Sequence, residues 1–148
     1  MTIKRILCAS DFSPTSRRAL RLAQEFARTF KAKLFLFHAY ERSLPMSNGG
    51  YLPPSVVQEM LTATREAARR KLQRLARSPN GKGVRISTLL AEGPASAAIV
   101  RAAKKNRVDL VVMGTHGRTG VLRLLMGSVA DRVIRTASCP VLVVGGRH

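Results

Sequence analysis

Several residue types are scarce in this chain, and each scarcity argues against a class of function. Its 148 residues include no tryptophan, only two cysteines, and 8 acidic side chains against 26 Lys and Arg. Cys8 and Cys139 lie far apart and have no Cys or His at zinc-ligand spacing, so we expect two small buried hydrophobic residues rather than a disulfide or a metal site. So few carboxylates, with no defensible Ser-His-Asp set, also leave little for acid–base or nucleophilic catalysis.

Long hydrophobic runs are also missing. No apolar run approaches the ~18 residues that a membrane span requires. The basic start of the chain leads into Asp11 and Ser13 rather than into the apolar stretch of a secretory signal. We therefore expect a cytoplasmic protein with no membrane segment. Hydrophobic residues still make up 45% of the chain, enough for a packed core, and the length predicts a single domain over residues 1–148.

The excess of basic residues gives a formal net charge of +18, which predicts attraction to polyanions. Many of the arginines, such as Arg17, Arg21, Arg69 and Arg70, recur in helical stretches without interleaved aromatic residues. We therefore interpret most of the charge as solvated helix surface, with nonspecific polyanion binding as an accompaniment.

Apolar runs alternate with helical periodicity along the whole chain, which predicts an α/β protein with an open parallel sheet and helices on both faces. The run 108–113 is the most apolar and is expected to be central, and 84–91 is expected to be an edge. Strands are predicted at 3–9, 34–39, 84–91, 108–113 and 141–144, and helices at 14–31, 54–78, after Gly93-Pro94 and at 128–136. In the helix at 54–78, the inner stripe is predicted to be Val57, Met60, Leu61, Thr64, Ala68, Leu72 and Leu75.

The stretch from Gly114 to Ser128 joins the predicted strand 108–113 to a helix and is rich in glycine. Glycines let the backbone approach a ligand closely, and the free N–H groups of a first helical turn attract anions. Connections of this kind usually run ~2–6 residues, and this one is about twice as long, which favours phosphate or nucleotide binding over a plain connector. No Lys precedes Ser128 as in a P-loop, and no glycine follows the first strand as in a dinucleotide-binding fingerprint.

The spacing Gly, two residues, Gly, nine residues, Gly-Ser resembles the nucleotide-binding signature of the universal stress protein family, in its ATP-binding branch. The resemblance covers nearly the whole chain, including Ile6-Leu-Cys-Ala-Ser-Asp11-Phe-Ser13, His38-Ala39, Gly93-Pro94 and Ser138-Cys-Pro140-Val-Leu-Val-Val144. It implies a Rossmann-like fold of the adenine nucleotide alpha hydrolase type, with strand order 3-2-1-4-5. It also implies an ATP-binding stress-response protein that acts as a homodimer.

The resemblance further implies which residues hold the nucleotide, with adenosine at the ends of the first two strands and the phosphates along the glycine loop. The implied residues are Ala9, Asp11, Ala39, Met113, Gly114, Thr115, Gly117, Arg118, Gly127, Ser128 and Val129. Mg²⁺ would accompany the triphosphate, held mainly by phosphate oxygens and water. From the residues alone, Asp11 fits a helix-capping or Asx-turn role as well as a ligand-binding one.

Two alternative functions remain from the residues alone. A slow ATPase or phosphotransferase would use Arg118 and Arg123 for their charge and His116 as the base in the loop. A basic nucleic-acid-binding protein would use the net charge. The apolar terminal strand Val141–Val144 would be an exposed edge, and pairing with its copy in a second subunit is the homodimer contact that we expect.

Overall fold

The structure is a computed structural model that describes residues 2–42, 52–115 and 126–145. Its strands are β1 (Arg5–Ala9), β2 (Lys33–Tyr40), β3 (Ile86–Glu92), β4 (Leu110–Gly114) and β5 (Val141–Val144). Its helices are α1 (Pro14–Thr29), α2 (Pro54–Ala76), α3 (Ala95–Lys105) and α4 (Ser128–Thr136), with a short 3₁₀ helix η1 (Pro79–Gly81). The predicted elements are therefore all present, and several are a few residues shorter than expected because helix and strand ends fray.

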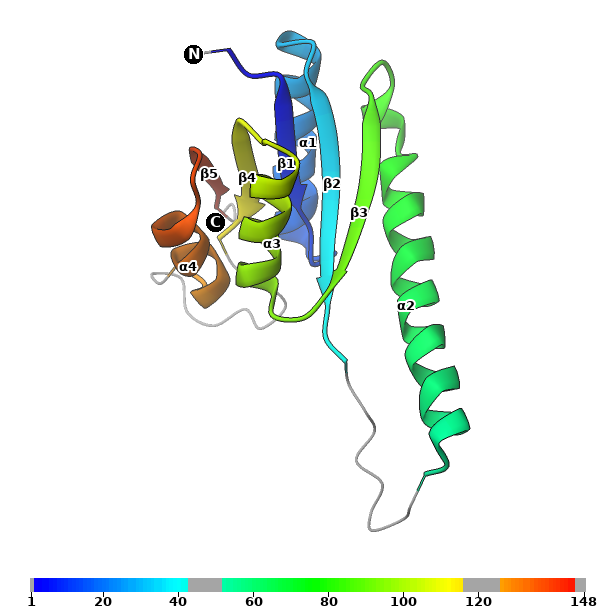
Figure 1. The fold of residues 1–148 in the computed structure, drawn as a ribbon. Coiled ribbons are helices and arrows are strands. Elements are labelled where there is room, and N and C mark those ends of the chain that lie inside the picture. The colour runs from blue at the N-terminus through cyan, green and yellow to red at the C-terminus, as the bar shows by residue number, and fades with distance from the viewer. Residues whose placement is uncertain (1, 43–51, 116–125, 146–148) are drawn as a thin grey trace.

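The five strands form one parallel sheet in the order β3-β2-β1-β4-β5, which confirms the predicted fold class (Figure 1). The edge position of β3 was also predicted correctly. The strand order implied by the family resemblance is confirmed as well. The run 108–113, expected to be central, forms the interior strand β4 between β1 and β5, and β1 occupies the middle of the sheet. Both strands are buried on both faces, and apolarity alone does not distinguish two such neighbours.

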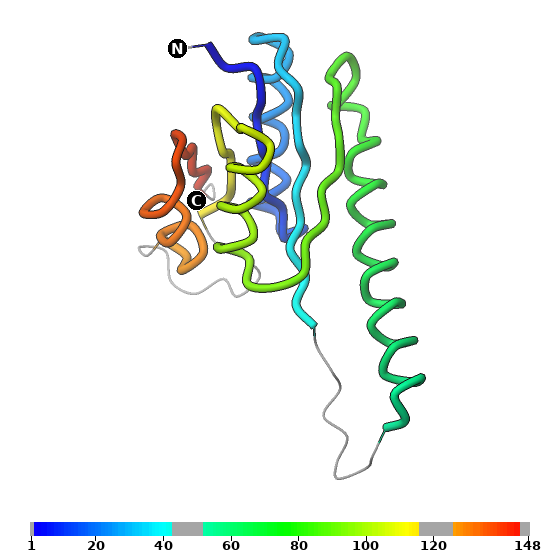
Figure 2. Tube along the Cα trace, in the orientation of Figure 1, coloured from blue at the N-terminus to red at the C-terminus, as the bar shows by residue number. Residues whose placement is uncertain are grey.

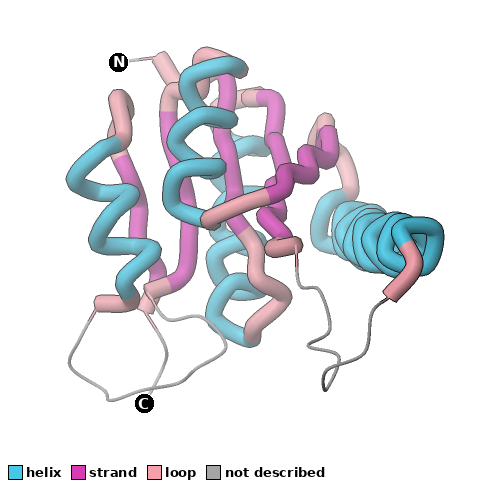
Figure 3. Tube along the Cα trace, turned by 60° about the horizontal axis from the view of Figure 1, so that its bottom comes forward, coloured by secondary structure: helices cyan, strands magenta, loops and turns pink. Residues whose placement is uncertain are grey.

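Helices cover both faces of the sheet (Figure 3). Along β1, Ile6 and Cys8 belong to the core cluster shared with α1 and α2, whereas Leu7 and Ala9 belong to the cluster shared with α3 and α4. This alternation is the two-residue period of a strand, and both sets are apolar because both faces are covered.

Helix α1 follows its sequence signals closely. Ser13 caps it by accepting a hydrogen bond from the Ser16 backbone N–H, and Pro14 occupies the first turn, as is usual at a helix start. Its apolar side, which includes Ala19, Leu20 and Ala23, lies against the sheet.

Helix α2 departs from the prediction in its first half. Of the seven residues predicted to form its inner stripe, Leu72 is fully buried, whereas Met60 and Thr64 are exposed. Figure 1 shows the reason, because the beginning of α2 extends beyond the end of β3 and has no sheet beneath it. A periodic apolar pattern indicates a helix but does not report how much of it the sheet covers.

Candidate functional site

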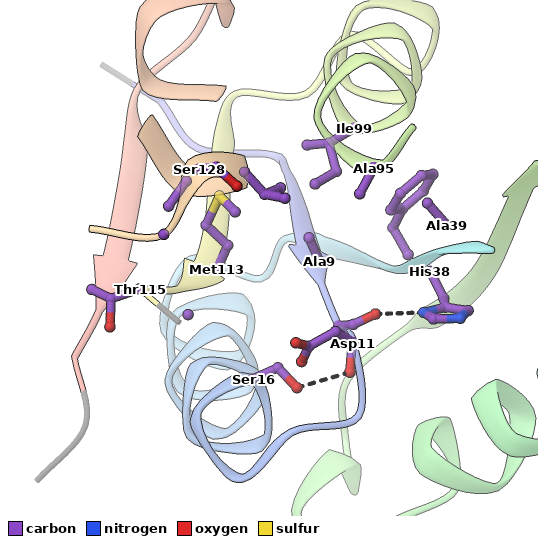
Figure 4. Close-up of a pocket in the computed structure, with 16 residues that line it drawn as sticks. Ala9, Asp11, Ser16, His38, Ala39, Ala95, Ile99, Met113, Thr115 and Ser128 are labelled. Atoms are coloured by element: carbon purple, nitrogen blue, oxygen red, sulfur yellow. Dashed lines mark hydrogen bonds between the residues drawn. The ribbon is translucent and has the colours of Figure 1, made fainter. Parts of the chain in front are cut away.

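A cavity of about 190 Å³ opens at the carboxyl ends of β1, β2 and β4. This is the point where strand order reverses, since β1 is followed by β2 on one side and lies next to β4 on the other. In open α/β sheets such a switch point leaves a crevice, because the connections leave in opposite directions. Figure 4 shows the lining residues converging on it from all three strands and from α3 and α4.

The turn between β1 and α1 forms one wall of the cavity and is rigidly held. Ser10 accepts the Phe12 backbone N–H at 3.1 Å through its hydroxyl, and that hydroxyl lies 3.1 Å from the hydroxyl of Ser16. The Ser10 carbonyl accepts a hydrogen bond from Nδ1 of His38 at 2.7 Å. Buried hydroxyls with partners of this kind fix a local backbone conformation.

Phe12 adopts the left-handed conformation with φ of 67°, which is strained for a bulky residue. The Phe12 ring packs on His38, with ring centroids 4.3 Å apart. The Nζ atom of Lys71, on α2, lies 4.6 Å from the centroid of the Phe12 ring. These contacts compensate for the strain and turn the chain sharply after Asp11.

Asp11 is the acidic residue of this wall. Its Oδ1 atom accepts the Ser13 backbone N–H at 3.0 Å, and its carboxylate points into the cavity (Figure 4). Partial burial raises the pKa of Asp11, but hydrogen bonds from the side chain and backbone of Ser13 and from Ser16 outweigh burial, and the pKa lies below the ordinary value of 3.8. Asp11 is therefore anionic at neutral pH.

The opposite wall is built from the two ends of the glycine-rich stretch. Gly114 ends β4, and Gly127 is the N-cap residue before α4, which has no side-chain capping hydrogen bond. The Gly127 N–H donates to the Thr115 carbonyl at 2.7 Å, so the two ends lie against each other. The first turn of α4, Ser128 to Ala130, therefore lines the cavity with the positive end of the helix dipole.

Apolar side chains form the remaining surface. Phe37 and Ala39 of β2 face Ala95 and Ile99 of α3, and Met113 of β4 completes this side. The cavity thus combines a backbone-rich end at α4, one carboxylate, and an apolar side. A mainly apolar pocket with a few converging polar groups is typical of small-molecule sites.

The structure brings together nine of the eleven residues implied by the resemblance. Those lining the cavity are Ala9, Asp11, Ala39, Met113, Gly114, Thr115, Gly127, Ser128 and Val129. Gly117 and Arg118, together with His116 and Arg123, lie outside the described residues. The lining residues that the sequence analysis missed are Ser10, Ser16, Phe37, His38, Ala95, Ile99 and Ala130. Ser10 and His38 adjoin predicted residues in the chain, whereas Ala95 and Ile99 carry no local signal of a ligand.

The two cysteines are free thiols. Burial raises the pKa of the Cys8 thiol to about 12, and burial followed by the charge of Asp109 raises the pKa of Cys139. Both thiols are therefore protonated at neutral pH. The prediction of a buried residue is confirmed for Cys8, whereas Cys139 is only partly buried and packs at the edge of the core. Within residues 2–42, 52–115 and 126–145, three or more His, Cys, Asp and Glu never cluster as metal ligands, and none of the helices there is long and apolar enough to cross a membrane.

This geometry defines a Rossmann-like α/β protein with a crevice at the switch point of its sheet. The sequence model of the universal stress protein family matches residues 2–145, and the chain belongs to that family. Universal stress protein MJ0531 of Methanocaldococcus jannaschii is 37% identical over 145 residues, covering 95% of this chain and 81% of that protein. A universal stress protein of Thermus aquaticus is also 37% identical, over 141 residues that cover 95% of this chain and 98% of that protein.

Solved structures agree with this assignment. The structure of MJ0577 from Methanocaldococcus jannaschii superimposes with a TM-score of 0.85 at 27% identity, covering 100% of this chain and 99% of that one. A universal stress protein in complex with cAMP shares the fold, with a TM-score of 0.66 at 24% identity over 97% of this chain and 98% of that one.

Proposed function

We propose that this protein binds ATP with Mg²⁺ in the cavity and acts as a nucleotide-dependent stress-response protein in the form of a homodimer. The observation that supports the nucleotide most directly is the convergence of Gly114, Gly127 and Ser128 with Asp11 around one cavity. These residues are distant in sequence, and a plain connector would not require them to share a concave surface.

The chemistry of the two sides of the cavity supports one orientation of the proposed nucleotide. The uncapped first turn of α4 offers backbone N–H groups to phosphate oxygens. The apolar side, with Ala39, Ile99 and Met113, suits the faces of an adenine ring. The Asp11 carboxylate lies between them and accepts hydrogen bonds from hydroxyl or amino groups of adenosine.

The residues present fit a metal ion that is carried by the nucleotide. Among the described residues that line the cavity, Asp11 is the one carboxylate. Mg²⁺ commonly retains several waters and binds substrate phosphates with one or two carboxylates. The ion would neutralise phosphate charge, while the chain itself holds the nucleotide through α4, Asp11 and the apolar side.

The exposed edge of the sheet supports the homodimer. The carbonyls of Pro140, which precedes β5, and of Val144 point toward β4, since they accept the N–H groups of Val111 and Thr115. Val141 and Val143 therefore direct their backbone groups toward the open edge, by the alternation of a parallel ladder. An apolar strand with unpaired N–H and C=O groups is a pairing surface for a second copy of itself.

The nucleotide site is tested by substituting Gly127. Gly127 has φ of −59° and ψ of 147°, which any L-residue adopts, so Gly127→Val should fold normally and place an isopropyl group where the phosphates would lie. We expect affinity for Mg²⁺-ATP, measured by isothermal titration calorimetry, to fall by ~100-fold, or about 2.7 kcal/mol.

The matched control is Gly145→Val, because Gly145 follows β5 outside the cavity and a Cβ there has nothing within 4 Å. This control should bind as wild type does. Wild-type affinity in a folded Gly127→Val protein would refute the site, and phosphate release in the same samples tests for slow hydrolysis.

The homodimer is tested by Val143→Pro, which removes one N–H from the open edge. Proline is tolerated on an edge strand where its N–H would face outward. Sedimentation equilibrium should show the wild type as a dimer and the variant with a dissociation constant raised by at least ~10-fold, about 1.4 kcal/mol. A monomeric wild type, or a variant that dimerises equally well, would contradict this contact.

A further inference from the structure

The end of the sheet opposite the cavity is unusually basic. A basic residue lies at or just before the start of each of the first three strands: Lys4 precedes β1, Lys33 begins β2 and Arg85 precedes β3. They are neighbours, because the Lys33 N–H donates to the Lys4 carbonyl at 2.8 Å and the Leu34 N–H donates to the Arg85 carbonyl at 2.9 Å. All three residues are exposed, and with strands ~4.8 Å apart their backbone positions form a row about 10 Å long.

The carboxyl ends of three helices add cations on both sides of this row. Arg28 and Lys31 lie at the end of α1, and Arg77 and Lys82 follow α2. On the other face, the cations at the end of α3 are Lys104, Lys105 and Arg107. All seven are exposed, and Figure 2 shows the ends of these helices gathered at the same end of the molecule as the strand starts. We call these ten residues the basic end.

Acidic residues do little to neutralise the basic end. The Oδ2 atom of Asp109, which precedes β4, accepts hydrogen bonds from the backbone N–H groups of Lys4 and Arg5, at 2.9 and 2.8 Å. The same oxygen lies 3.9 Å from Nε of Arg5. Glu25 lies about one turn back along α1. Within the described chain, none of the ten cations of the basic end forms a salt bridge.

Two of these cations occupy backbone positions that favour glycine. Lys31 and Arg107 follow the caps of α1 and α3 with φ of 53° and 50°, the left-handed conformation in which glycine is the common residue. Cations near a helix end interact favourably with its dipole. At α3, Lys104 and Lys105 in the last turn already provide this interaction with the helix dipole. Arg107 therefore adds positive charge that the end of the helix does not require.

We propose that the basic end is a second binding site, which holds the phosphate backbone of a nucleic acid without reading its sequence. A duplex presents one phosphate per ~1.7 Å of axis, and Lys and Arg contacts to these phosphates supply most of the sequence-independent affinity. Ten exposed cations across three strand starts and three helix ends, none of them in a salt bridge among the described residues, meet that requirement.

An acidic membrane is the less suitable partner. Stable attachment to a membrane combines cations with apolar side chains that insert. Phe30, at the end of α1, is 47% exposed, but its ring packs edge-on against Phe26 with centroids 5.9 Å apart. Among the described residues, the other exposed large apolar side chain near the carboxyl end of a helix, Ile134 at 42%, lies on α4, which carries none of the ten cations. The surface is therefore cationic without an inserting face.

The test compares two variants of equal net charge by fluorescence anisotropy with a labelled 20-base-pair DNA duplex at 50 mM salt. The first carries Lys31→Gln, Lys82→Gln, Arg85→Gln and Lys105→Gln at the basic end. The control carries Arg21→Gln, Arg65→Gln, Arg70→Gln and Arg132→Gln, four exposed arginines of α1, α2 and α4. Each lowers the net charge from +18 by four.

We expect the wild type to bind the duplex and the basic-end variant to bind at least ~30-fold more weakly. The slope of log affinity against log salt should fall by about 3 to 4 in that variant and by less than ~1 in the control, since each lost phosphate contact removes about 1. Mg²⁺-ATP should not displace the duplex, because the cavity is at the opposite end of the sheet.

Three results would overturn the proposal. Equal loss in both variants would show attraction to diffuse charge rather than a surface. Absence of wild-type binding at 50 mM salt would exclude the site. Binding to vesicles containing phosphatidylserine, without binding to the duplex, would assign the surface to membranes. Failure of ATP binding would not affect the test, because the ten cations and the lining of the cavity share no residue.

Discussion

Helices begin at one end of this sheet and finish at the other. Free backbone N–H groups therefore lie at the first end and free carbonyls at the second, and the side chains around them differ in size and charge. At the carboxyl ends of the strands, α3 and α4 begin, and their free N–H groups surround a concave cavity in which small residues such as Gly114 and Ala39 leave room. At the other end, α1, α2 and α3 finish in carbonyls, and exposed Lys and Arg surround them. An anion is thus attracted by backbone groups at one end and by flexible side chains at the other, which favours a fitted small ligand at the first and an extended polyanion at the second.

The largest expected difference between the ends is their response to salt. For about five phosphate contacts, raising salt from 50 to 200 mM should weaken binding of the duplex by roughly 500-fold. Binding of Mg²⁺-ATP should weaken by less than ~10-fold, because the cavity shields its contacts from screening. Anisotropy and calorimetry over the same salt series measure both quantities. Parallel losses would show that the two ligands share one electrostatic surface.

The next effect concerns the packing behind the cavity. A Cβ at Gly114 would lie 3.0 Å from Cγ2 of Thr15 and 3.3 Å from the backbone nitrogen of Ser16. Gly114→Ala should therefore push β4 from the start of α1 and lower the free energy of unfolding by about 2 kcal/mol. Lys33→Ala at the exposed basic end should lower it by less than ~0.5 kcal/mol. Urea denaturation tests this contrast, and equal costs would mean that the two ends are equally tightly packed.

Asp11→Asn removes the charge at the cavity without changing its shape. We expect Mg²⁺-ATP affinity to fall about 10-fold, or 1.4 kcal/mol. Because the folded pKa of Asp11 lies below 3.8, its ionised form stabilises the fold fully above the unfolded pKa, and this contribution is lost as pH falls through the folded value. Urea denaturation from pH 7 to pH 2.5 should therefore show wild type and variant converging at the acidic end. A stability difference that is independent of pH would contradict the role assigned to the charge.

The smallest effect distinguishes folding from binding at the basic end. Lys31→Gly removes the strain of a left-handed backbone conformation but gives the unfolded chain more conformational freedom. The net effect should raise the free energy of unfolding by about 0.5 kcal/mol. The same variant should bind the duplex about 3-fold more weakly, since one cation is lost. A variant that is more stable and binds equally well would show that Lys31 serves the helix end only.

Much of the fold was predictable because its signals are local. The alternation of apolar runs and helical stretches predicted all five strands and four helices, and Ser13-Pro14 predicted where α1 begins. The first half of α2 was not predictable in the same way, because its apolar pattern describes a helix and not the extent of the sheet beside it. The family resemblance implied the strand order 3-2-1-4-5 correctly, whereas apolarity alone could not place β1 and β4, because both strands are buried on both faces.

The sequence by itself determined the fold class, the family and the glycine-rich stretch, because periodicity and spacing are properties of the chain. The tertiary structure decided which distant residues meet. It brought Asp11 and Ala39 to the same cavity as Gly127, and added Ala95 and Ile99, which no local pattern marks. It also separated the basic residues by position, since ten cations that are scattered from residue 4 to residue 107 gather only when parallel strands start and helices end on one side of a sheet.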